Sequence, residues 1–512
     1  MEENTAEESD KLFDILVIGG GINGTGIARD AIGRGFSVCL CEANDLASGT
    51  SSSSSKLIHG GLRYLEHYEF KLVRKALQER EVLLQMAPHI VSPMRFVLPH
   101  KEEMRPFWLL RLGLFIYDHL GYRHLLPGSC KVDLTTGSVG NALKSNLELG
   151  LEYSDCWVDD ARLVVLNAMD AAKRGAEMNV HTRVIDAKRI DNIWLIRIQN
   201  SLTGKEATRK SRILVNAAGP WVDEVLDTLS NSHVNKNVRL VRGSHIVVNK
   251  IFDHEKSYIF QNTDGRIIFA IPYEENYTLI GTTDQDHGPR VGSINIENQE
   301  REYLCESANA YFQKQISEED VVWSFSGIRP LFNDDAPNAQ EATRDYVIDV
   351  RSGKTPPLIN IFGGKITTYR RLSETVVQHI ESYLGKRNPA WTAQSKLPGG
   401  EFSAEGIMDL AEQLHNKYFF LTREEIYRFT RTYGTISKNI LGDSKSYTDL
   451  GEHFGSGLYQ KEIEYLVAYE WATTAEDVLF RRTKLGIGAS QKMKDKINRF
   501  LDDMPRPHSI TF

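Results

Sequence analysis

Cysteine is scarce in this chain. There are 5 cysteines in 512 residues, and no two of them form a CxxC pair. This argues against zinc ribbons and thioredoxin-like redox sites, and we expect no metal site. Cys39 and Cys41 lie two residues apart on an expected strand and therefore share one face. We expect two buried apolar thiols in a reducing compartment.

Long apolar runs and an excess of positive charge are also missing. No uninterrupted apolar run reaches the roughly 18 residues that a membrane-spanning helix needs. Residues 1–11 are polar and acidic, without the basic and apolar regions of a secretory signal. The formal net charge is −7, whereas dedicated nucleic-acid binders are usually basic. We expect a cytoplasmic protein with no nucleic-acid partner and at most peripheral membrane contact.

The composition is that of a globular protein with more than one domain. Hydrophobic residues make up 41% and charged residues 25% of the sequence. A chain of 512 residues is too long for one ordinary core. Residues 386–401 are rich in proline, glycine and polar side chains, and we interpret them as a linker. The sequence after it has helical patterning, including a capping box formed by Thr422 and Glu425.

Residues 14–42 are typical of a strand–helix–strand unit that binds a dinucleotide. Residues 14–19 are an apolar run that ends in glycine, 22–34 have helical character, and 36–42 are a second apolar run. Helix 69–86 follows. Further strands are expected at 183–198, 212–221, within 239–284, where antiparallel pairing is the natural expectation, and at 358–362.

The turn after the first strand carries a dinucleotide fingerprint. Gly19, Gly21 and Gly24 fit the pattern G-x-G-x-x-G. The first glycine permits the tight turn, the second lets backbone N–H groups reach a pyrophosphate, and the third allows close packing of helix and strand. Glu42 ends the second strand, where a carboxylate accepts a hydrogen bond from a ribose hydroxyl and repels a 2′-phosphate. The nucleotide should be FAD or NAD, not NADP.

Two features favour FAD over NAD. The second strand leads into residues 45–65, a loop dense in hydroxyl groups and glycine that can wrap a pyrophosphate and a ribityl chain. Gly363, Gly364 and Lys365 stand at the start of a long helix. The positive end of that helix, beside the pyrimidine edge of a flavin, would stabilise negative charge on the reduced ring.

At this point the sequence resembles a known family. Its motifs are similar to those of the FAD-dependent glycerol-3-phosphate dehydrogenases, most of all the bacterial aerobic, membrane-associated form, over almost the whole chain. The motifs are GGGINGTGIARDA, SSSSSKLIHGGLRYLEHYEF, EYSDCWVDDARL, NAAGPWVD, GSHIVV, IGTTD, SGIRPL, FGGKITTYR and EDVLFRRTKLG.

The resemblance implies a fold and a reaction. The expected fold is α/β: a Rossmann-type FAD-binding domain of the D-amino-acid-oxidase type, a mixed or antiparallel substrate cap and a C-terminal helical domain. The implied reaction oxidises sn-glycerol 3-phosphate to dihydroxyacetone phosphate, with hydride passing to flavin N5 and electrons to a membrane quinone at the inner face of the cell membrane. A homodimer is among the expected assemblies. The oxidoreductase part should span 12–385, with FAD-binding segments at about 12–75, 151–222 and 321–385 and a cap mostly at 223–320, and the linker and helical domain should span 386–512.

Three cations stand in turns bounded by glycine or proline: Arg63, Arg329 and Lys365. A fixed phosphate calls for such cations. The resemblance places them around the substrate with Tyr64, His245 and Thr282. Arg329, His245 and Lys365 are the catalytic candidates. His245 is a candidate general base, with a core histidine as the alternative, and Arg329 could polarise the reacting oxygen.

The expected FAD contacts are drawn from the same motifs. A covalent flavin link through His59 stays open on residues alone, but the resemblance implies non-covalent FAD. The candidate cofactor residues are Gly19, Gly21, Asn23, Gly24, Glu42, Ser54, Ser55, Lys56, His59, Gly219, Gly363, Gly364, Lys365 and Thr367.

Three other functions fit parts of the sequence. They are a flavin-dependent amine or amino-acid oxidase on the same fold, an NAD-dependent dehydrogenase, and a non-catalytic FAD-binding protein. Two segments are candidates for membrane contact. Residues 107–122 form a short apolar stretch with Trp108 and Tyr117, flanked by Arg105 and Arg123, and residues 479–484 have a basic end. The alternative for the first segment is a core or dimer-interface helix.

Overall fold

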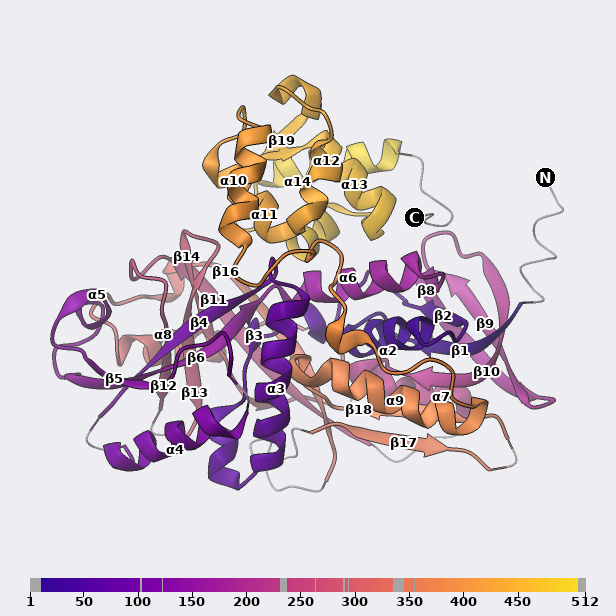
Figure 1. The fold of residues 1–512 in the computed structure, drawn as a ribbon, viewed down its shortest axis with the longest axis horizontal. Coiled ribbons are helices and arrows are strands. Elements are labelled where there is room, and N and C mark those ends of the chain that lie inside the picture. The colour runs from indigo at the N-terminus through magenta and orange to yellow at the C-terminus, as the bar shows by residue number, and fades with distance from the viewer. Residues whose placement is uncertain are drawn as a thin grey trace.

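The computed structural model describes most of the chain: residues 11–101, 104–121, 123–230, 237–262, 264–288, 291–292, 294–334, 345–353 and 355–504. Figure 1 shows two β-sheets side by side, with a separate helical part, coloured orange to yellow, beyond them. The expectation of an α/β fold with a C-terminal helical domain is confirmed.

The first sheet is the mostly parallel one. Within the described residues its strand order is β17-β18-β10-β1-β2-β7, with β9 beside β10 and β8 beside β9. The pairs β1–β2, β1–β10, β10–β18 and β2–β7 are parallel. The strands are β1 (Leu12–Ile18), β2 (Val38–Cys41), β7 (Glu177–Asn179), β8 (Thr182–Ile190), β9 (Ile193–Asn200), β10 (Glu206–Asn216), β17 (Val347–Arg351) and β18 (Leu358–Phe362).

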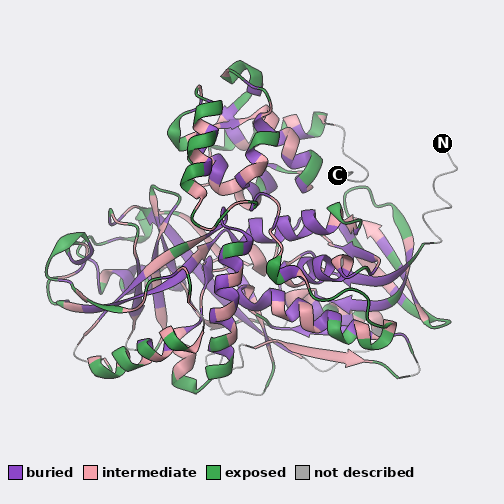
Figure 2. Cartoon of the chain, in the orientation of Figure 1, coloured by how far each residue is buried: buried purple, intermediate pink, exposed green. Residues whose placement is uncertain are grey.

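Strand β1 is buried on both faces, which explains its nearly continuous apolar sequence. Ile15 and Val17 belong to a core shared with three helices, α2 (Ile22–Gly33), α6 (Asp160–Lys173) and α9 (Tyr369–Leu384). Leu16 and Ile18 face the other way, into a core shared with β9 and with α7 (Val222–Ser230). Figure 2 shows α2, α6 and the central strands as mostly buried. The strand–helix–strand prediction for 14–42 agrees with β1, α2 and β2 to within a few residues.

The second sheet is mostly antiparallel. Among the described residues its order is β15-β11-β14-β13-β12-β4-β6-β3, with β16 beside β11 and β5 beside β6. It includes strands from outside the expected 223–320 cap. The strands are β3 (Leu57–Ile58), β4 (Val91–Pro99), β5 (Cys130–Asp133), β6 (Leu149–Val158), β11 (Val238–Asn249), β12 (Ser257–Gln261), β13 (Ile267–Tyr273), β14 (Tyr277–Gly281), β15 (Gln285–Asp286) and β16 (Val321–Phe332).

Helices cover this second sheet. Helix α8 (Asn298–Asn309) packs on β11, β13 and β14, and α5 (Gly137–Asn141) belongs to the same core. Helix α3 (Phe70–Met86) matches the predicted helix 69–86 and contributes to the core beneath β6. Its Glu79 forms a buried ion pair with Arg370, 2.6 Å apart, which ties α3 to α9.

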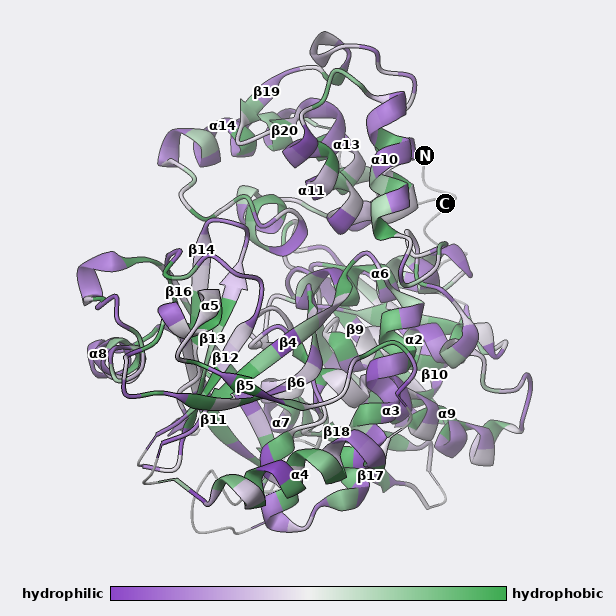
Figure 3. Cartoon of the chain, turned by 60° about the vertical axis from the view of Figure 1, so that its left-hand side comes forward, coloured by the Kyte–Doolittle hydropathy of each residue, from purple (hydrophilic) through white to green (hydrophobic). Residues whose placement is uncertain are grey.

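Helix α4 (Phe107–Leu120) lies at the edge of the molecule away from the C-terminal helices (Figures 1 and 3). Trp108, Leu112 and Phe115 lie on its exposed face at helical spacing, with exposed fractions of 66%, 46% and 57%. Tyr117, which the sequence suggested as an interfacial aromatic, is instead buried and donates its hydroxyl hydrogen bond to Asp155. Tyr122 of the predicted segment is outside the described residues.

The second membrane candidate, residues 479–484, is wrong. Arg482 is fully buried and Lys484 nearly so, because both form ion pairs inside the protein. Within the described chain, no helix is long and apolar enough to cross a membrane.

The C-terminal part has its own apolar core. Its helices are α10 (Ile407–Lys417), α11 (Arg423–Tyr433), α12 (Ser437–Leu441), α13 (Gln460–Glu470) and α14 (Gln491–Asp503), with the hairpin of β19 (His453–Gly455) and β20 (Leu458–Tyr459). The predicted capping box of Thr422 and Glu425 begins α11. The segment interpreted as a linker is packed against the first domain: Trp391 donates to the carbonyl of Asp30, and Leu397 is fully buried.

Candidate active site

A cavity of about 850 Å³ lies where the two sheets meet. Its walls come from the glycine turn after β1, the loop after β2, strands β11 and β13, and the turn after β18. Such a volume is typical of sites for cofactors and small ligands. Two ends of the cavity have different chemistry, and we describe them in turn.

The first end is a backbone cradle. Gly19 has a positive φ of +109°, and a side chain there would place its Cβ 2.6 Å from the carbonyl oxygen of Ala217. A Cβ at Gly24 would lie 1.9 Å from the carbonyl oxygen of Gly19. Gly21 stands at the N-cap of α2 and lines the cavity. The tight turn, the open helix N-terminus and the close packing each fall on the glycine that the fingerprint assigns.

Glu42 lines the same end of the cavity. Its Oε2 accepts a hydrogen bond from the N–H of Gly20 at 2.6 Å, and its Oε1 accepts one from Asn44 at 2.8 Å. Burial raises the pKa of Glu42, and these two backbone donors oppose the rise. The carboxylate is thus fixed at the carboxyl end of β2, where the ribose of a bound nucleotide belongs.

The cavity wall also contains an unsatisfied acceptor. Asn23 donates from Nδ2 to the carbonyl of Gly363, 3.3 Å away, but its buried Oδ1 has no hydrogen-bond partner among the described residues. Buried polar atoms nearly always have partners, so this oxygen calls for a ligand donor. Gly363 and Gly364 have φ values of +72° and +101° and lead into the turn before α9. These features fit a dinucleotide that extends from Glu42 toward Gly364.

The second end is built from side chains. Arg329 on β16 donates to the Asp284 carboxylate, to the carbonyl of Thr283 at 3.2 Å and to Oγ1 of Thr282 at 2.9 Å. Lys365 Nζ lies 3.4 Å from the centre of the Tyr64 ring. All six predicted substrate residues line the cavity: Arg63, Tyr64, His245, Thr282, Arg329 and Lys365.

His245 lies on β11, opposite Gly281 on one side and Phe325 on the other. Its ring stacks on Phe325 at 4.8 Å, and its Nε2 is 2.9 Å from Oγ of Ser55. Nδ1 has no hydrogen-bond partner among the described residues. Burial lowers the pKa of His245 well below its ordinary range, and the charges of Arg329 and Lys56 lower it further. The imidazole is therefore neutral at neutral pH.

His59 lines the cavity beside this cluster. Its backbone N–H donates to Oγ1 of Thr367 at 3.3 Å, which joins two of the predicted cofactor segments. Burial lowers the pKa of His59 to about 3, with contributions from Lys365 and Arg80. This histidine is also neutral at neutral pH.

Two predicted cofactor residues do not line the cavity. Gly24 acts through helix packing. Lys56 is buried, and its Nζ lies 2.9 Å from Asp160, whose other oxygen accepts from Ser54. The remaining predicted cofactor residues do line it: Gly19, Gly21, Asn23, Glu42, Ser54, Ser55, His59, Gly219, Gly363, Gly364, Lys365 and Thr367.

Sequence reasoning missed Asp284, Asp160 and Ser51. Asp284 pairs with Arg329, and Ser51 accepts from the N–H of Ile22 in the first turn of α2. Asp284 and Asp160 both lie inside motifs quoted above, so a search for carboxylate partners of the cations within those motifs could have found them.

The cradle, the carboxylate at its end and the two-sheet frame define a flavoprotein oxidoreductase. The model of the family described as FAD dependent oxidoreductase matches residues 14–370, and that of the C-terminal domain of alpha-glycerophosphate oxidase matches residues 390–508. The chain therefore belongs to the FAD-dependent oxidoreductase family. FAD is its cofactor, as predicted.

Full-length relatives narrow the class. The chain is 48% identical over 504 residues to a glycerol-3-phosphate dehydrogenase of Pseudomonas aeruginosa, covering 98% of each. It is 49% identical to D-erythritol 1-phosphate dehydrogenase of Brucella abortus, covering 92% of this chain and 94% of that one. The crystal structure of the glycerol-3-phosphate dehydrogenase from Bacillus halodurans complexed with FAD matches with a TM-score of 0.75 at 28% identity, covering 97% and 95%. The predicted resemblance to the FAD-dependent glycerol-3-phosphate dehydrogenases is thus confirmed.

Proposed function

We propose that this chain oxidises sn-glycerol 3-phosphate to dihydroxyacetone phosphate and passes the electrons to a membrane quinone. The observation that carries the proposal is the meeting of Arg63, Arg329 and Lys365 in one cavity with the FAD cradle. A phosphate dianion calls for several cations, whereas the carboxylate of an amino acid calls for one arginine. The names of the full-length relatives support the same substrate class.

The three cations have different surroundings and therefore different roles. Arg63 and Lys365 line the same end of the cavity, with the Lys365 Nζ over the ring of Tyr64, and we assign both to the phosphate charge. Arg329 is already neutralised by Asp284 and held in place by Thr282. We assign it to the substrate oxygen at C2, where a fixed guanidinium stabilises developing negative charge.

His245 is the proposed base for the C2 hydroxyl proton. It is neutral, and in the tautomer whose Nε2 donates to Ser55, Nδ1 is an acceptor with no partner among the described residues. Arg329 and Lys56 depress its basicity in the free protein. A bound phosphate dianion offsets that positive potential and raises the basicity when substrate is present. FAD, when bound without a covalent link, supplies a hydride acceptor at N5.

A second substrate is favoured by a specific observation. A relative of nearly equal identity carries the name of an erythritol phosphate dehydrogenase. The test is kcat/KM with a dye acceptor for sn-glycerol 3-phosphate, D-erythritol 1-phosphate, glycerol and glycine. We expect glycerol 3-phosphate to be best, and glycerol to lose at least about thirtyfold because removal of a paired charge costs about 2–5 kcal/mol. Faster turnover of D-erythritol 1-phosphate would make it the preferred substrate. Turnover of glycine would contradict the proposal that the enzyme is a sugar-alcohol phosphate dehydrogenase and favour an amino-acid oxidase.

A quinone dissolved in lipid requires contact with a membrane, and we assign that contact to α4 at the inner face of the cell membrane. Its exposed face carries Trp108, Leu112 and Phe115 around Arg111. Of the flanking arginines, Arg105 pairs with Glu66 and Arg123 with Asp118, so apolar insertion is the main attraction.

Co-sedimentation with anionic vesicles tests the contact. We expect binding that falls when Trp108 and Phe115 are both changed to Ser, because about 1.5–3 kcal/mol is lost for each large apolar side chain withheld from lipid. The matched control changes Met408 and Phe419 to Ser, since these are equally exposed, at 64% and 74%, but lie in the C-terminal domain at the other end of the molecule. Equal losses in both variants, or no binding by the unmodified protein, would refute the assignment. Turnover with oxygen in place of a quinone analogue would refute the acceptor.

A further inference from the structure

The motif EDVLFRRTKLG plays no part in the cavity. Within it, residues Asp477–Arg482 form a π-helical turn, η9, in the C-terminal domain. Such turns are rare and occur often at functional sites. The turn and the residues after it carry Arg481, Arg482 and Lys484, and all three side chains are mostly buried. Each reaches out of the C-terminal domain to a carboxylate of the FAD-binding domain.

The two arginines meet at one aspartate. Arg482 donates to both oxygens of Asp45, at 2.8 Å each, and Arg481 donates to one of them at 2.6 Å. Asp45 is itself nearly fully buried. Two guanidinium groups on a single buried carboxylate form a strong and directional contact.

Lys484 makes the second contact. Its Nζ lies 3.2 Å from Asp159 and 3.9 Å from Asp160. Asp160 in turn accepts from the hydroxyl of Ser54 at 2.7 Å and pairs with Lys56 at 2.9 Å. The C-terminal domain therefore reaches the neighbourhood of Ser54 and Lys56 through the N-terminus of α6.

The first contact falls directly on one loop, and the second reaches the same loop through Asp160. Asp45 lies near the start of residues 42–56, and Ser54 and Lys56 lie at its end. Between the two contacts, residues 47–51 and 53–55 line the cavity, and Ser51 holds the first turn of α2. The loop has little regular structure: one short 3-10 turn, Thr50–Ser52. An irregular loop of this length costs conformational entropy to order, so its fixed ends matter.

We infer that residues 477–484 act as a clamp through which the C-terminal domain fixes the FAD-contacting loop 42–56. Arg481, Arg482 and Lys484 are positioning residues: they touch neither the cavity nor the substrate, and they act through Asp45 and Asp160. FAD affinity and the docking of the C-terminal domain are then coupled, and the coupling is reciprocal. The inference rests on the FAD site alone and does not depend on the identity of the substrate.

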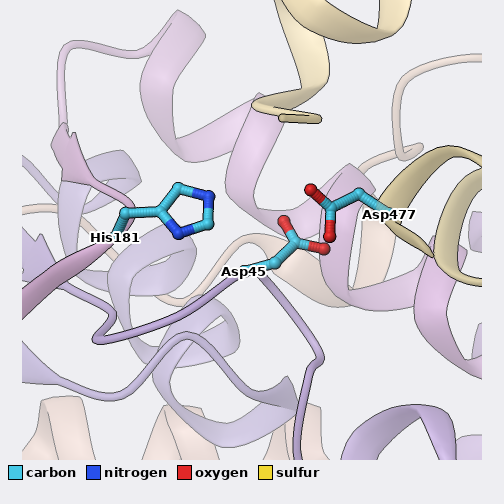
Figure 4. Close-up of side chains that lie close together, drawn as sticks. All are labelled: Asp45, His181 and Asp477. Atoms are coloured by element: carbon cyan, nitrogen blue, oxygen red, sulfur yellow. The ribbon is translucent and has the colours of Figure 1, made fainter. Parts of the chain in front are cut away.

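A metal ion is the other explanation for this region. Asp45, His181 and Asp477 bring one ligand atom each within 4.8 Å of one another, and Figure 4 shows the two carboxylates close together. Both carboxylates are already engaged by arginine. Burial raises the pKa of Asp477, but the charges of Arg481 and Arg482 outweigh burial and lower this pKa to about 2. A cation added here would face two guanidinium groups. We therefore interpret the cluster as a contact between the two domains of the chain.

The clamp is tested on the full-length protein. The variants are Arg481→Gln and Lys484→Met, with Arg482→Gln as a more severe change and Arg481→Lys as the conservative one. The matched control is Arg428→Gln, which removes a buried ion pair with Glu462 inside the C-terminal domain, away from the loop. Each protein is freed of flavin and titrated with FAD, and melting temperatures are recorded with and without FAD. Hydrogen exchange of residues 477–484 is compared in the same two states.

We expect the FAD dissociation constant to rise at least about fivefold in Arg481→Gln and Lys484→Met, the lower bound of typical coupling between sites. Excess FAD should restore most of the turnover, and Arg481→Lys should recover part of the affinity. FAD should slow hydrogen exchange at residues 477–484 in the unmodified protein. FAD should also raise the melting temperature of the unmodified protein by more than it raises the melting temperatures of the variants. Arg428→Gln should lose stability but keep its FAD affinity. Unchanged FAD affinity in both mild variants would overturn the clamp, and so would an equal loss in the control.

Discussion

The two ends of the cavity are built in different ways. The nucleotide end is made mainly by backbone from one short stretch, with Gly19 in the turn after β1, Gly24 in α2 and Glu42 directly after β2. The substrate end is made by side chains that come from distant parts of the chain, with Arg63 in the 3-10 helix Leu62–His67, Lys365 in the turn before α9 and Arg329 on β16 of the second sheet. The first end depends on space for the backbone, and the second depends on charge. Substitutions should separate them: changes at the first should remove the flavin, and changes at the second should spare it.

The largest effect should come from Gly24→Ala. The new Cβ would lie 1.9 Å from the backbone oxygen of Gly19, so helix α2 must shift away from β1. Overpacking of this kind costs about 1–3 kcal/mol or more, and we expect a destabilised, colourless protein. The matched change is Gly113→Ala in α4, which lies outside the cavity and whose Cβ meets nothing within 4 Å. Flavin content per chain is the measurement. Equal flavin in the two variants would show that packing does not shape this end.

Arg329→Met should have the next largest effect. It removes the guanidinium that we assign to the reacting oxygen and that pairs with Asp284. We expect kcat/KM to fall at least about thirtyfold, because transition-state binding should weaken by about 2–5 kcal/mol, while flavin content stays normal. Arg239→Met is the control, because Arg239 also lies on the second sheet and pairs with an aspartate, Asp286, but does not line the cavity. Loss of flavin in Arg329→Met, or normal efficiency, would erase the distinction between the two ends.

The substrate end should also leave a mark on the pH dependence of stability. Burial holds the pKa of His245 well below its ordinary 6.5, so below pH 6.5 the unfolded chain takes up a proton that the folded chain does not. The stabilising contribution of the neutral histidine is therefore fully present above pH 6.5. As the pH falls below 6.5, the free energy of unfolding decreases by up to about 1.4 kcal/mol per pH unit for each such histidine. His59, with a pKa of about 3, has the same sign.

The measurement is the free energy of unfolding of the FAD-loaded protein between pH 7.5 and pH 5. His245→Gln should reduce the slope, whereas His119→Gln, a change at an exposed histidine of α4, should leave it unchanged. The same slope in the protein and in His245→Gln would mean that His245 becomes protonated in the folded state.

Glu42→Gln should have the smallest effect. The amide keeps the shape of the side chain but loses the charge that accepts from Gly20 and Asn44. We expect FAD to bind about tenfold more weakly, since a hydrogen bond to a charged group contributes about 1.5–3 kcal/mol. Glu224→Gln, at a carboxylate that lines the same cavity from α7, should leave FAD affinity intact. Titration of flavin-free protein measures both, and a stronger effect at Glu224 would contradict the placement of the ribose.

The same contrast explains what the sequence could and could not predict. Local patterns of a few residues predict the turn at Gly19–Gly24 and helix α3, and both predictions agree with the structure. The pairing of Arg329 with Asp284 needs two strands of the second sheet to meet, which no local pattern specifies. The sequence predicts membrane contact for residues 479–484 because a run of cations usually lies on the surface. Their partners, Asp45 and Asp159, are far away in the chain, so burial of the charges could not be foreseen.

One measurement tests the central claim most directly: the absorbance of the purified protein before and after anaerobic addition of sn-glycerol 3-phosphate. The account predicts a yellow protein whose flavin absorbance is bleached by glycerol 3-phosphate and restored by a quinone analogue. Under the same conditions, Arg329→Met should stay yellow and bleach much more slowly. A colourless protein would contradict the FAD site, and a yellow protein that glycerol 3-phosphate leaves unchanged would contradict the proposed reaction.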